Sequence, residues 1–459
     1  MLKKLIGDKK FYLSVLALTL PIMIQNAITN FVNMLDNVMV GQVGTVQMTG
    51  VAVANQLIFV FNLCVFGAVS GAGIFTAQFF GTGSDEGVRH TFRFKVIFCS
   101  VLTALFMLAF IFAGKPLIML YLKGDGDAAD AAASLGYAYK YLICMLVGLL
   151  PYTLAQCYSS TLRETGKTVP PMVAGIIAVL VNLVLNYCLI FGNFGFPKLG
   201  VVGAAVATVI SRYVELFIVA GWTHKRKDTN KFIVGAYRSL FVPMVLVKQI
   251  FVRGMPLLLN ETLWSVGMAT LNQCYSVRGL DVVAATNISQ TFWNVFAVAF
   301  TAFGASIGII LGQLLGADEF EKAKEQSYKL IAFTVFASIV VAVVYIPCAE
   351  FIPYIYNTGD GIRHMATRLM QIGALVMPLD AFAHATYFTI RSGGKTFITF
   401  LFDCGFVWLI SVPTAFVLSR FTGLGILAIF AVVQSLNAIK CVLGGWLVKK
   451  GIWIKNIVE

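Results

Sequence analysis

Charged side chains are scarce in this sequence. Of its 459 residues, 12% are charged and 59% are hydrophobic, and Asp and Glu together number only 21. This excludes an ordinary soluble domain, in which about a quarter of the residues are charged. Apolar runs long enough to cross a bilayer as helices, about 20 residues each, recur along the whole chain. The composition therefore predicts an all-α integral membrane protein.

Several chemical signatures are also missing. The nine cysteines contain no CxxC pair and the four histidines form no HExxH pattern, so neither a disulfide framework nor a zinc site is expected. Two GKT triplets lack the first glycine of a Walker A motif, because Thr161 and Thr389 stand at those positions. We therefore predict that the protein is not an enzyme, has no cofactor, and takes its energy from an ion gradient.

Basic residues, which give a net charge of +13, gather in the short segments between apolar stretches. There they act as determinants of membrane topology, so no nucleic-acid partner is expected. Their excess on one side predicts a multi-pass protein of the inner (plasma) membrane with both termini in the cytoplasm, and the basic N-terminus is interpreted as retained. The twelve predicted spans are approximately residues 11–35, 47–80, 94–113, 134–160, 170–192, 201–222, 249–276, 283–315, 328–348, 365–390, 397–419 and 424–448.

The two halves of the chain resemble each other. Pro21 and Pro256, and Gln78 and Gln313, recur at the same offset of 235 positions, and RETGKT is echoed by RSGGKT. Six spans in each half make the repeats parallel, which predicts two pseudo-symmetric six-helix lobes around a central cavity and transport by alternating access. The predicted organisation is an N-lobe at 1–222, an interlobe linker at 223–248 and a C-lobe at 249–459.

Five acidic residues lie within predicted spans, although each costs about 2.5 to 3.5 kcal/mol at the centre of a span. They are Asp36, Glu215, Glu261, Asp380 and Asp403. For Asp403 and Glu215, snorkelling or local pairing is at least as good an interpretation as function. The deeper Glu261 and Asp380 favour function, whereas position alone leaves Asp36 open between a helix-end carboxylate and a functional one.

Amide side chains accompany these acids. One helical face near Asp36 carries asparagines spaced three or four residues apart, about one turn each: Asn26, Asn30, Asn33 and Asn37. Single amides often join helices, but a stripe that carries an acid is typical of a water-filled cavity. His384, one turn after Asp380, is either a core histidine or a group that polarises or exchanges a proton with that aspartate.

Several of these segments resemble the multidrug and toxic compound extrusion (MATE) family. The resemblance rests on LPIMIQNAITNFVNMLDNVMVGQVG, SGAGIFTAQFFGTGSDEGVRHTFR, LNYCLIFG with GVVGAAVAT, and PLDAFAHATYFTIRSGGKT, which follow in the family's order from about residue 11 to residue 448. It implies a twelve-helix exporter that exchanges organic cations, drugs or toxic metabolites for inward-moving H⁺ or Na⁺.

The resemblance also implies a cation-coupling site. Its N-lobe members are Asp36, Asn182, Asn186 and Thr208, with Na⁺ a candidate ion at Asp36; relatives often carry an aspartate at the position of Asn186, which leaves the choice between Na⁺ and H⁺ open. The C-lobe counterparts are Asp380 and, less closely matched in register, Glu261.

Soft, polar and aromatic side chains in the spans are candidates for lining a permissive substrate cavity. They are Gln56, Tyr275, Gln290, Trp293, Asn294, Met23 and Met34. We expect a monomer in the bilayer with small organic cations or drugs as partners. A lipid-linked precursor flippase of similar build is the alternative, although it would need a cluster of arginines for a pyrophosphate. An ion channel is a second rival and would not need a titratable carboxylate in each half.

Overall fold

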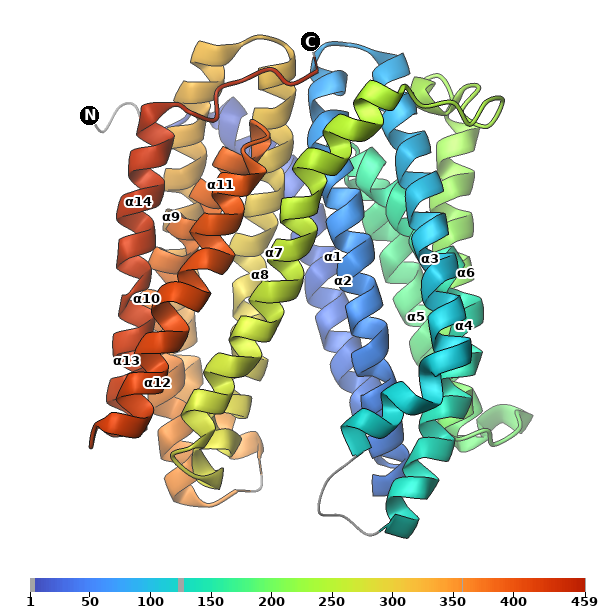
Figure 1. The fold of residues 1–459 in the computed structure, drawn as a ribbon, viewed down its shortest axis with the longest axis vertical. Helices are drawn as coiled ribbons and strands as arrows, with labels where there is room; N and C mark the ends of the chain where they lie inside the picture. Colours follow the sequence, from blue (N-terminus) through green and yellow to red (C-terminus); the bar gives the residue numbers. More distant parts are fainter. Residues whose placement is uncertain (1–4, 123–127, 357, 459) are drawn as a thin grey trace. The chain divides into compact units, whose positions relative to one another are not determined.

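The structure, a computed structural model, describes residues 5–122, 128–356 and 358–458 (Figure 1). Within these ranges it describes all side chains except those at positions 33, 34, 37, 38, 45, 122, 128 and 129. The described chain is helical throughout and contains no β-strand. Its helices are α1 Lys9–Gly41, α2 Thr45–Gly81, α3 Asp85–Leu122, α4 Ala128–Glu164, α5 Val169–Phe191, α6 Val201–Lys225, α7 Met244–Ser276, α8 Leu280–Gly316, α9 Phe320–Phe351, α10 Asp360–Ser392, α11 Thr396–Phe400, α12 Val412–Phe421, α13 Ile426–Ser435 and α14 Asn437–Lys450.

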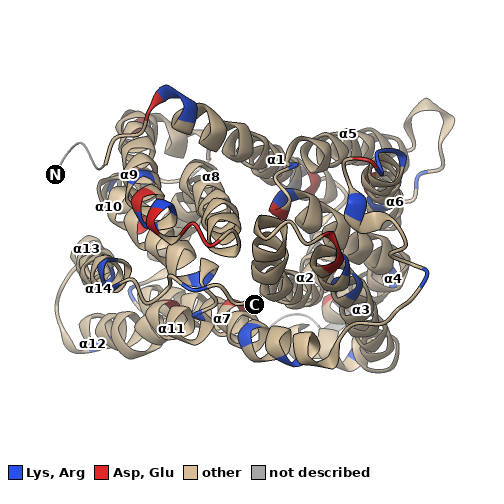
Figure 2. Ribbon diagram, turned by 90° about the horizontal axis from the view of Figure 1, so that it is seen from above, with Lys and Arg blue, Asp and Glu red and all other residues tan. Residues whose placement is uncertain are grey.

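The twelve predicted spans fall on twelve helical stretches. The last two stretches are composite: two π-helical turns, η5 Leu401–Gly405 and η6 Val407–Ser411, join α11 to α12, and α14 follows directly on α13. Among the described residues, ten stretches are long and apolar enough to cross a membrane by length and composition. The other two are α7 and α10. Along the ribbon as a whole, charged residues are sparse (Figure 2).

Several helices begin earlier than the apolar pattern predicts. The predicted starts at residues 94, 249 and 328 become Asp85 in α3, Met244 in α7 and Phe320 in α9. In α3 the first turn carries Asp85 and Glu86, and acidic side chains stabilise a helix N-terminus. Hydropathy locates the part of a helix that lies in lipid, so it misses turns that continue into water.

The described chain divides into two compact units. Unit 1 comprises Met1–Met23, Ala77–Gly83 and Phe251–Glu459, and unit 2 comprises Ile24–Thr76 and Ser84–Ile250. The division therefore falls inside α1, shortly after Pro21, and inside α2. The core of unit 2 gathers fully buried residues such as Phe61, Cys99 and Leu142. In unit 1, the fully buried Tyr345 stacks on Phe296 with 4.2 Å between the ring centroids.

Two glycines in unit 1 make reciprocal close contacts. A Cβ atom on Gly81, at the end of α2, would lie 2.0 Å from the backbone oxygen of Gln313, and a Cβ atom on Gly316, at the end of α8, would lie 2.0 Å from that of Gln78. Gly81 and Gly316 are 235 positions apart, and so are Gln78 and Gln313. Each contact therefore becomes the other when the two repeats are exchanged, as a two-fold relation requires. The internal repeat detected in the sequence therefore appears here as a pair of matched backbone contacts.

The chain after α14 folds back over the end of unit 1. The Trp453 side chain is fully buried. The amide nitrogen of Gln78 donates to the Ser392 carbonyl at 2.9 Å, and its oxygen accepts from the backbone nitrogen of Ile457 at 2.8 Å. Asn456 donates to Asp318 Oδ1 at 2.9 Å. The tail thus ties the end of α2 to the α8–α9 and α10–α11 turns.

The predicted interlobe linker packs against α3 in unit 2. Arg93 donates to the carbonyl oxygens of Ala236 at 2.7 Å and Gly235 at 2.8 Å, and Arg89 donates to that of Phe232 at 3.2 Å. Arg89 and Arg93 are among the basic residues that set the predicted topology, and here they also donate to carbonyl groups of the linker. The boundaries of the predicted lobes and linker remain a prediction.

Candidate cation site

Three helices of unit 2 bring four polar side chains together. Asp36 comes from α1, Asn182 and Asn186 lie one turn apart on α5, and Thr208 comes from α6. Asn186 Nδ2 donates to Asp36 Oδ1 at 2.7 Å, and the side chains of Asn182 and Thr208 are 3.2 Å apart. The four residues that the sequence grouped by resemblance are therefore neighbours in space.

The Asn182 amide reaches Asp36 in one of its two orientations. In the other, its Oδ1 accepts from Asn186 Nδ2 at 3.1 Å. With the oxygen and nitrogen exchanged, Nδ2 lies 3.0 Å from Asp36 Oδ2, and Oδ1 lies 3.2 Å from Thr208 Oγ1 and 3.3 Å from the Thr208 nitrogen. Exchange of this kind is an assignment made from the hydrogen-bond network. Both asparagines then donate to the Asp36 carboxylate, which suits the ionised form of the aspartate.

A buried oxygen in this group lacks a partner. Asn186 is only 1% exposed, and its Oδ1 accepts no hydrogen bond from the described part of the chain. Carboxylate, amide and hydroxyl oxygens are the ligands that hard cations prefer. The oxygens of Asp36, Asn186 and Thr208 are therefore suited to a small cation, and a proton on Asp36 is the simpler alternative. Among the described residues, no group of three His, Cys, Asp or Glu side chains could hold a metal ion.

One arginine stands beside this group. Arg212, one turn after Thr208 on α6, pairs with Glu215 at 3.3 Å and lies over the Tyr152 ring at 4.8 Å from its centroid. It also acts electrostatically on Asp36. The local pairing predicted for Glu215 is confirmed, and the arginine keeps a positive charge near the carboxylate without bonding to it.

Unit 1 holds a second polar group within its predicted spans. Asn437 Nδ2 donates to Asp380 Oδ1 at 2.5 Å, and Lys440 Nζ donates to Asp403 Oδ1 at 2.7 Å. Asn260 Nδ2 donates to the other oxygen of Asp403 at 3.3 Å. These contacts join α7, α10, η5 and α14.

This group corrects one expectation and leaves another as a prediction. Asp403 neither snorkels nor pairs locally, because its partner, Lys440, lies on another helix. The signal in the sequence for this pair was Lys440 itself, a charged residue inside a predicted span that needs a partner of opposite charge. Glu261 acts electrostatically with Arg391 and Asp403, but among the described contacts no hydrogen bond joins it to Asp380. Whether Glu261 and Asp380 take part in coupling therefore stays a prediction.

His384 packs among aromatic rings instead of reaching Asp380. Its ring lies 5.8 Å from that of Phe300 and 4.9 Å from that of Phe388, and its Nε2 is buried without a hydrogen-bond partner in the described chain. Of the two interpretations in the sequence, this geometry favours the core histidine over the group that exchanges a proton with Asp380.

The residues predicted to line a substrate cavity lie in different surroundings. Gln56, Gln290 and Asn294 are exposed, with Gln290 donating to Asn294 at 3.2 Å along α8. Trp293 packs beside Gly373, Tyr275 is 3% exposed beside Phe430, and Met23 packs on Ile22, Ala302 and Ile309. The side chain of Met34 lies outside the described part of the chain. The assignment of these residues to a cavity stays a prediction.

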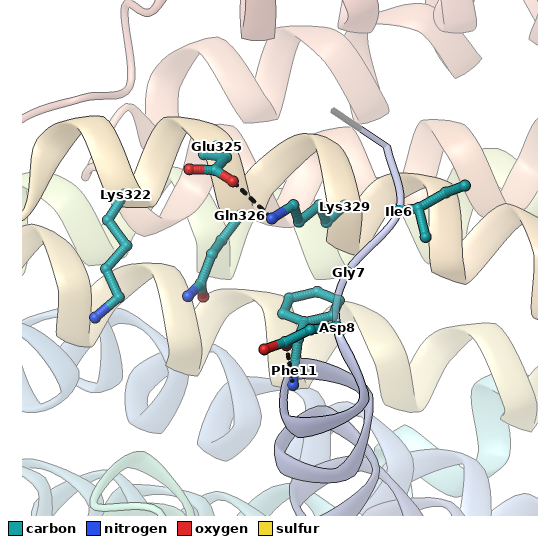
Figure 3. Close-up of a pocket in the computed structure, with 8 residues that line it drawn as sticks. All are labelled: Ile6, Gly7, Asp8, Phe11, Lys322, Glu325, Gln326 and Lys329. Atoms are coloured by element: carbon teal, nitrogen blue, oxygen red, sulfur yellow. Dashed lines mark hydrogen bonds and ion pairs between the residues drawn. The ribbon is translucent and has the colours of Figure 1, made fainter. Parts of the chain in front are cut away.

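A pocket of about 520 Å³ opens elsewhere on unit 1, where the start of α1 meets the first turns of α9 (Figure 3). Asp8 caps α1 by accepting from the Phe11 nitrogen at 2.8 Å, and Lys329 pairs with Glu325 at 2.6 Å. These side chains belong to the start of α1, the segment before it and the first turns of α9. None of the predicted site residues lines this pocket.

Comparison with known proteins agrees with this architecture. The MatE family model matches residues 21–188 and 256–417. The probable multidrug resistance protein NorM of Thermotoga maritima is 25% identical over 415 residues, covering 89% of this chain and 86% of the relative. The multidrug resistance protein MdtK of Photorhabdus laumondii is 25% identical over 405 residues, covering 88% and 87%.

A solved structure has the same fold. An outward-facing multidrug resistance MATE family transporter of the MOP superfamily superposes with a TM-score of 0.87 at 19% identity, covering 98% of each chain. This likeness shows the fold: an all-α, twelve-helix membrane protein. With the family model matched in both halves of the sequence, the chain belongs to the MatE family of membrane transporters.

Proposed function

We propose that this chain is a secondary active multidrug exporter, which moves organic cations, drugs or toxic metabolites out of the cell in exchange for inward H⁺ or Na⁺. The observation that carries the proposal is the Asp36 group in unit 2. A carboxylate placed inside a span costs several kcal/mol of insertion free energy unless it is used or paired. The Asp36 carboxylate accepts hydrogen bonds from neutral amides, and no lysine or arginine of the described chain is bonded to it.

Coupling follows from the charge of Asp36. Taking up a cation from the outer side neutralises the carboxylate, and releasing it inside restores the charge, so the two states differ in how α1 packs against α5. The boundary between the units falls in α1 after Met23, between Asp36 and the start of the helix. We propose that α1 rearranges there. Alternating access then expels one substrate for each ion cycle.

The relatives support export of drugs, since one is named a probable multidrug resistance protein and the other a multidrug resistance protein. The proposal makes the protein a transporter and not an enzyme, acting as a monomer in the plasma membrane with both termini in the cytoplasm. A flippase is less well supported, because in the described part of the chain the arginine beside the Asp36 group, Arg212, is already engaged by Glu215 and Tyr152.

The proposal is tested by efflux of ethidium from cells that express the chain. Ionophores collapse the sodium gradient and the proton gradient in separate experiments. We expect efflux to stop when the gradient of the coupling ion is removed. It should persist when only the gradient of the other ion is removed. Efflux that ignores both gradients would exclude an ion-coupled exporter.

Asn186→Asp should change the ion dependence of transport. The substitution places a second carboxylate at hydrogen-bonding distance from Asp36, and two adjacent carboxylates cannot both be ionised without a cation between them. We expect Na⁺ to be bound about tenfold more tightly, or proton release to require a higher pH by about one unit. Transport rates measured against Na⁺ concentration at several pH values distinguish these results. Unchanged dependence on both ions would show that residue 186 is outside the coupling site.

A further inference from the structure

A lysine occupies an unusual position within the predicted spans of unit 1. Its Nζ atom lies 2.7 Å from Asp403 Oδ1, and 5.4 and 5.5 Å from the ring centroids of Phe402 and Phe406. The Lys440 side chain is 12% exposed and that of Asp403 is 23% exposed. A carboxylate beside two aromatic rings is the chemistry by which proteins bind ammonium groups. Lys440 therefore fills an ammonium site made by other residues of its own chain.

The backbone around this site departs from regular helix on both sides. Asp403 and Phe402 lie in the π-helical turn η5, and Phe406 connects η5 to η6. Lys440 lies in the first turn of α14, directly after the end of α13 at Ser435. π-Helical turns and interrupted helices occur preferentially at functional sites and at the ion and substrate sites of transporters. A purely structural ion pair between two regular helices would need neither.

A buried acceptor beside Asp403 has no donor. Asn260 is 2% exposed and donates through Nδ2 to Asp403 Oδ2, while its Oδ1 has no hydrogen-bond partner in the described chain. Lys440 reaches the other carboxylate oxygen and leaves this amide oxygen unsatisfied. A buried polar atom of this kind costs about 1 to 3 kcal/mol. An N–H group on a ligand at Asp403 would satisfy it.

We propose that Asp403, Asn260, Phe402 and Phe406 form a binding site for the ammonium group of an exported organic cation, and that Lys440 is a tethered competitor for that site. This rests on the proposed export of organic cations. When a substrate ammonium group enters, it takes the place of the Lys440 ammonium group beside Asp403. Asp403 therefore remains paired with one positive charge. Asp380 is the second anion on which Lys440 acts electrostatically, and it receives the displaced lysine.

Competition by the lysine makes a specific prediction for binding. The apparent affinity for a ligand falls by the fraction of protein whose site is open. If Lys440 fills the site for about nine-tenths of the time, its removal should strengthen binding of a monovalent cation about tenfold. The probe is monodansylcadaverine, a fluorescent monovalent cation with a primary ammonium group, and binding to the purified full chain is followed by fluorescence polarisation.

Four variants decide the question. Lys440→Met should bind the probe about tenfold more tightly, whereas Asp403→Asn/Lys440→Met, which loses the anion as well, should bind no better than the wild type. Lys450→Met is the matched control, because Lys450 is an exposed lysine of the same helix that lies 4.9 Å from the Trp446 ring centroid. It should not change binding. Asn260→Leu leaves the ion pair in place and should weaken binding severalfold, so it decides the matter if Lys440→Met does not fold.

A structural ion pair gives the opposite pattern. Lys440→Met would then lower the thermal midpoint of unfolding without strengthening probe binding, and the double variant would recover the midpoint, since removing both charges is far milder than stranding one. That result, or unchanged binding in folded Asn260→Leu, overturns the inference. If instead the wild-type protein neither binds nor exports monovalent cations, the proposed function itself fails.

Discussion

Asp36→Asn should reduce the gradient of exported substrate from as much as fortyfold to none. An ion moving down a membrane potential of about 100 mV releases about 2.3 kcal/mol, which can sustain roughly a fortyfold concentration difference of a neutral substrate. For a monovalent cation exchanged one for one, the electrical part cancels and the chemical gradient of the ion sets the limit. The variant amide neither binds a proton at neutral pH nor offers a charged ligand to Na⁺. Steady-state accumulation of substrate in inverted vesicles, with a gradient imposed, measures this directly.

The variant should still fold. Asparagine keeps the shape of aspartate, and its Oδ1 can still accept from Asn186 Nδ2, the 2.7 Å contact of the wild type. Asp130→Asn is the matched control, because it makes the same chemical change at an exposed position in the first turn of α4. Wild-type accumulation by a correctly inserted Asp36→Asn would exclude Asp36 as the coupling residue.

Gly316→Ala and Gly81→Ala should each destabilise unit 1 by about 1 to 3 kcal/mol or more. The added methyl carbon would sit 2.0 Å from a backbone oxygen, Gln78 O in the first case and Gln313 O in the second. Backbone atoms cannot turn aside as a flexible side chain can, so the helix ends must separate, and overpacking of this kind costs about 1 to 3 kcal/mol or occasionally more. The thermal midpoint of unfolding in detergent is the measurement.

Gly361→Ala provides the comparison. Gly361 lies in the first turn of α10 in the same unit, and a Cβ atom there would meet nothing within 4 Å. Alanine has the higher helix propensity, so this substitution should be neutral or slightly stabilising. Equal midpoints for Gly316→Ala, Gly81→Ala and Gly361→Ala would show that the reciprocal contact does not hold the helix ends together.

Much of this arrangement could be predicted because its signals are local. Twelve apolar stretches predict twelve spans, and Asn182 and Asn186, one turn apart, must face the same way on a helix. The constant offset between Gln78 and Gln313 indicates a repeat. The resemblance to a family then supplied the partners on other helices, Asp36 and Thr208, which spacing alone could not bring together.

The remaining features depend on contacts between distant parts of the chain. Asp403 and Lys440 lie on different helices, and neither hydropathy nor helical spacing indicates which buried charge meets which. π-Helical turns leave no mark on an apolar pattern, so η5 and η6 could not be foreseen. The buried Trp453 follows the last span in a basic segment that reads as an ordinary solvated tail. Only contacts show that this segment is packed: Trp453 Nε1 donates to the Val448 carbonyl of α14, and Gln78 Nε2 donates to the Lys455 carbonyl.

The most direct test of the central claim is reciprocal flux in vesicles that contain only the purified protein. An outward gradient of an exported cation, with no ion gradient imposed, should drive H⁺ or Na⁺ uphill in the opposite direction, and the ion flux should vanish in Asp36→Asn. A fluorescent pH indicator and radioactive sodium report the two ions separately. Substrate that crosses at the wild-type rate while neither ion moves would contradict antiport and leave a channel or a facilitator as the explanation.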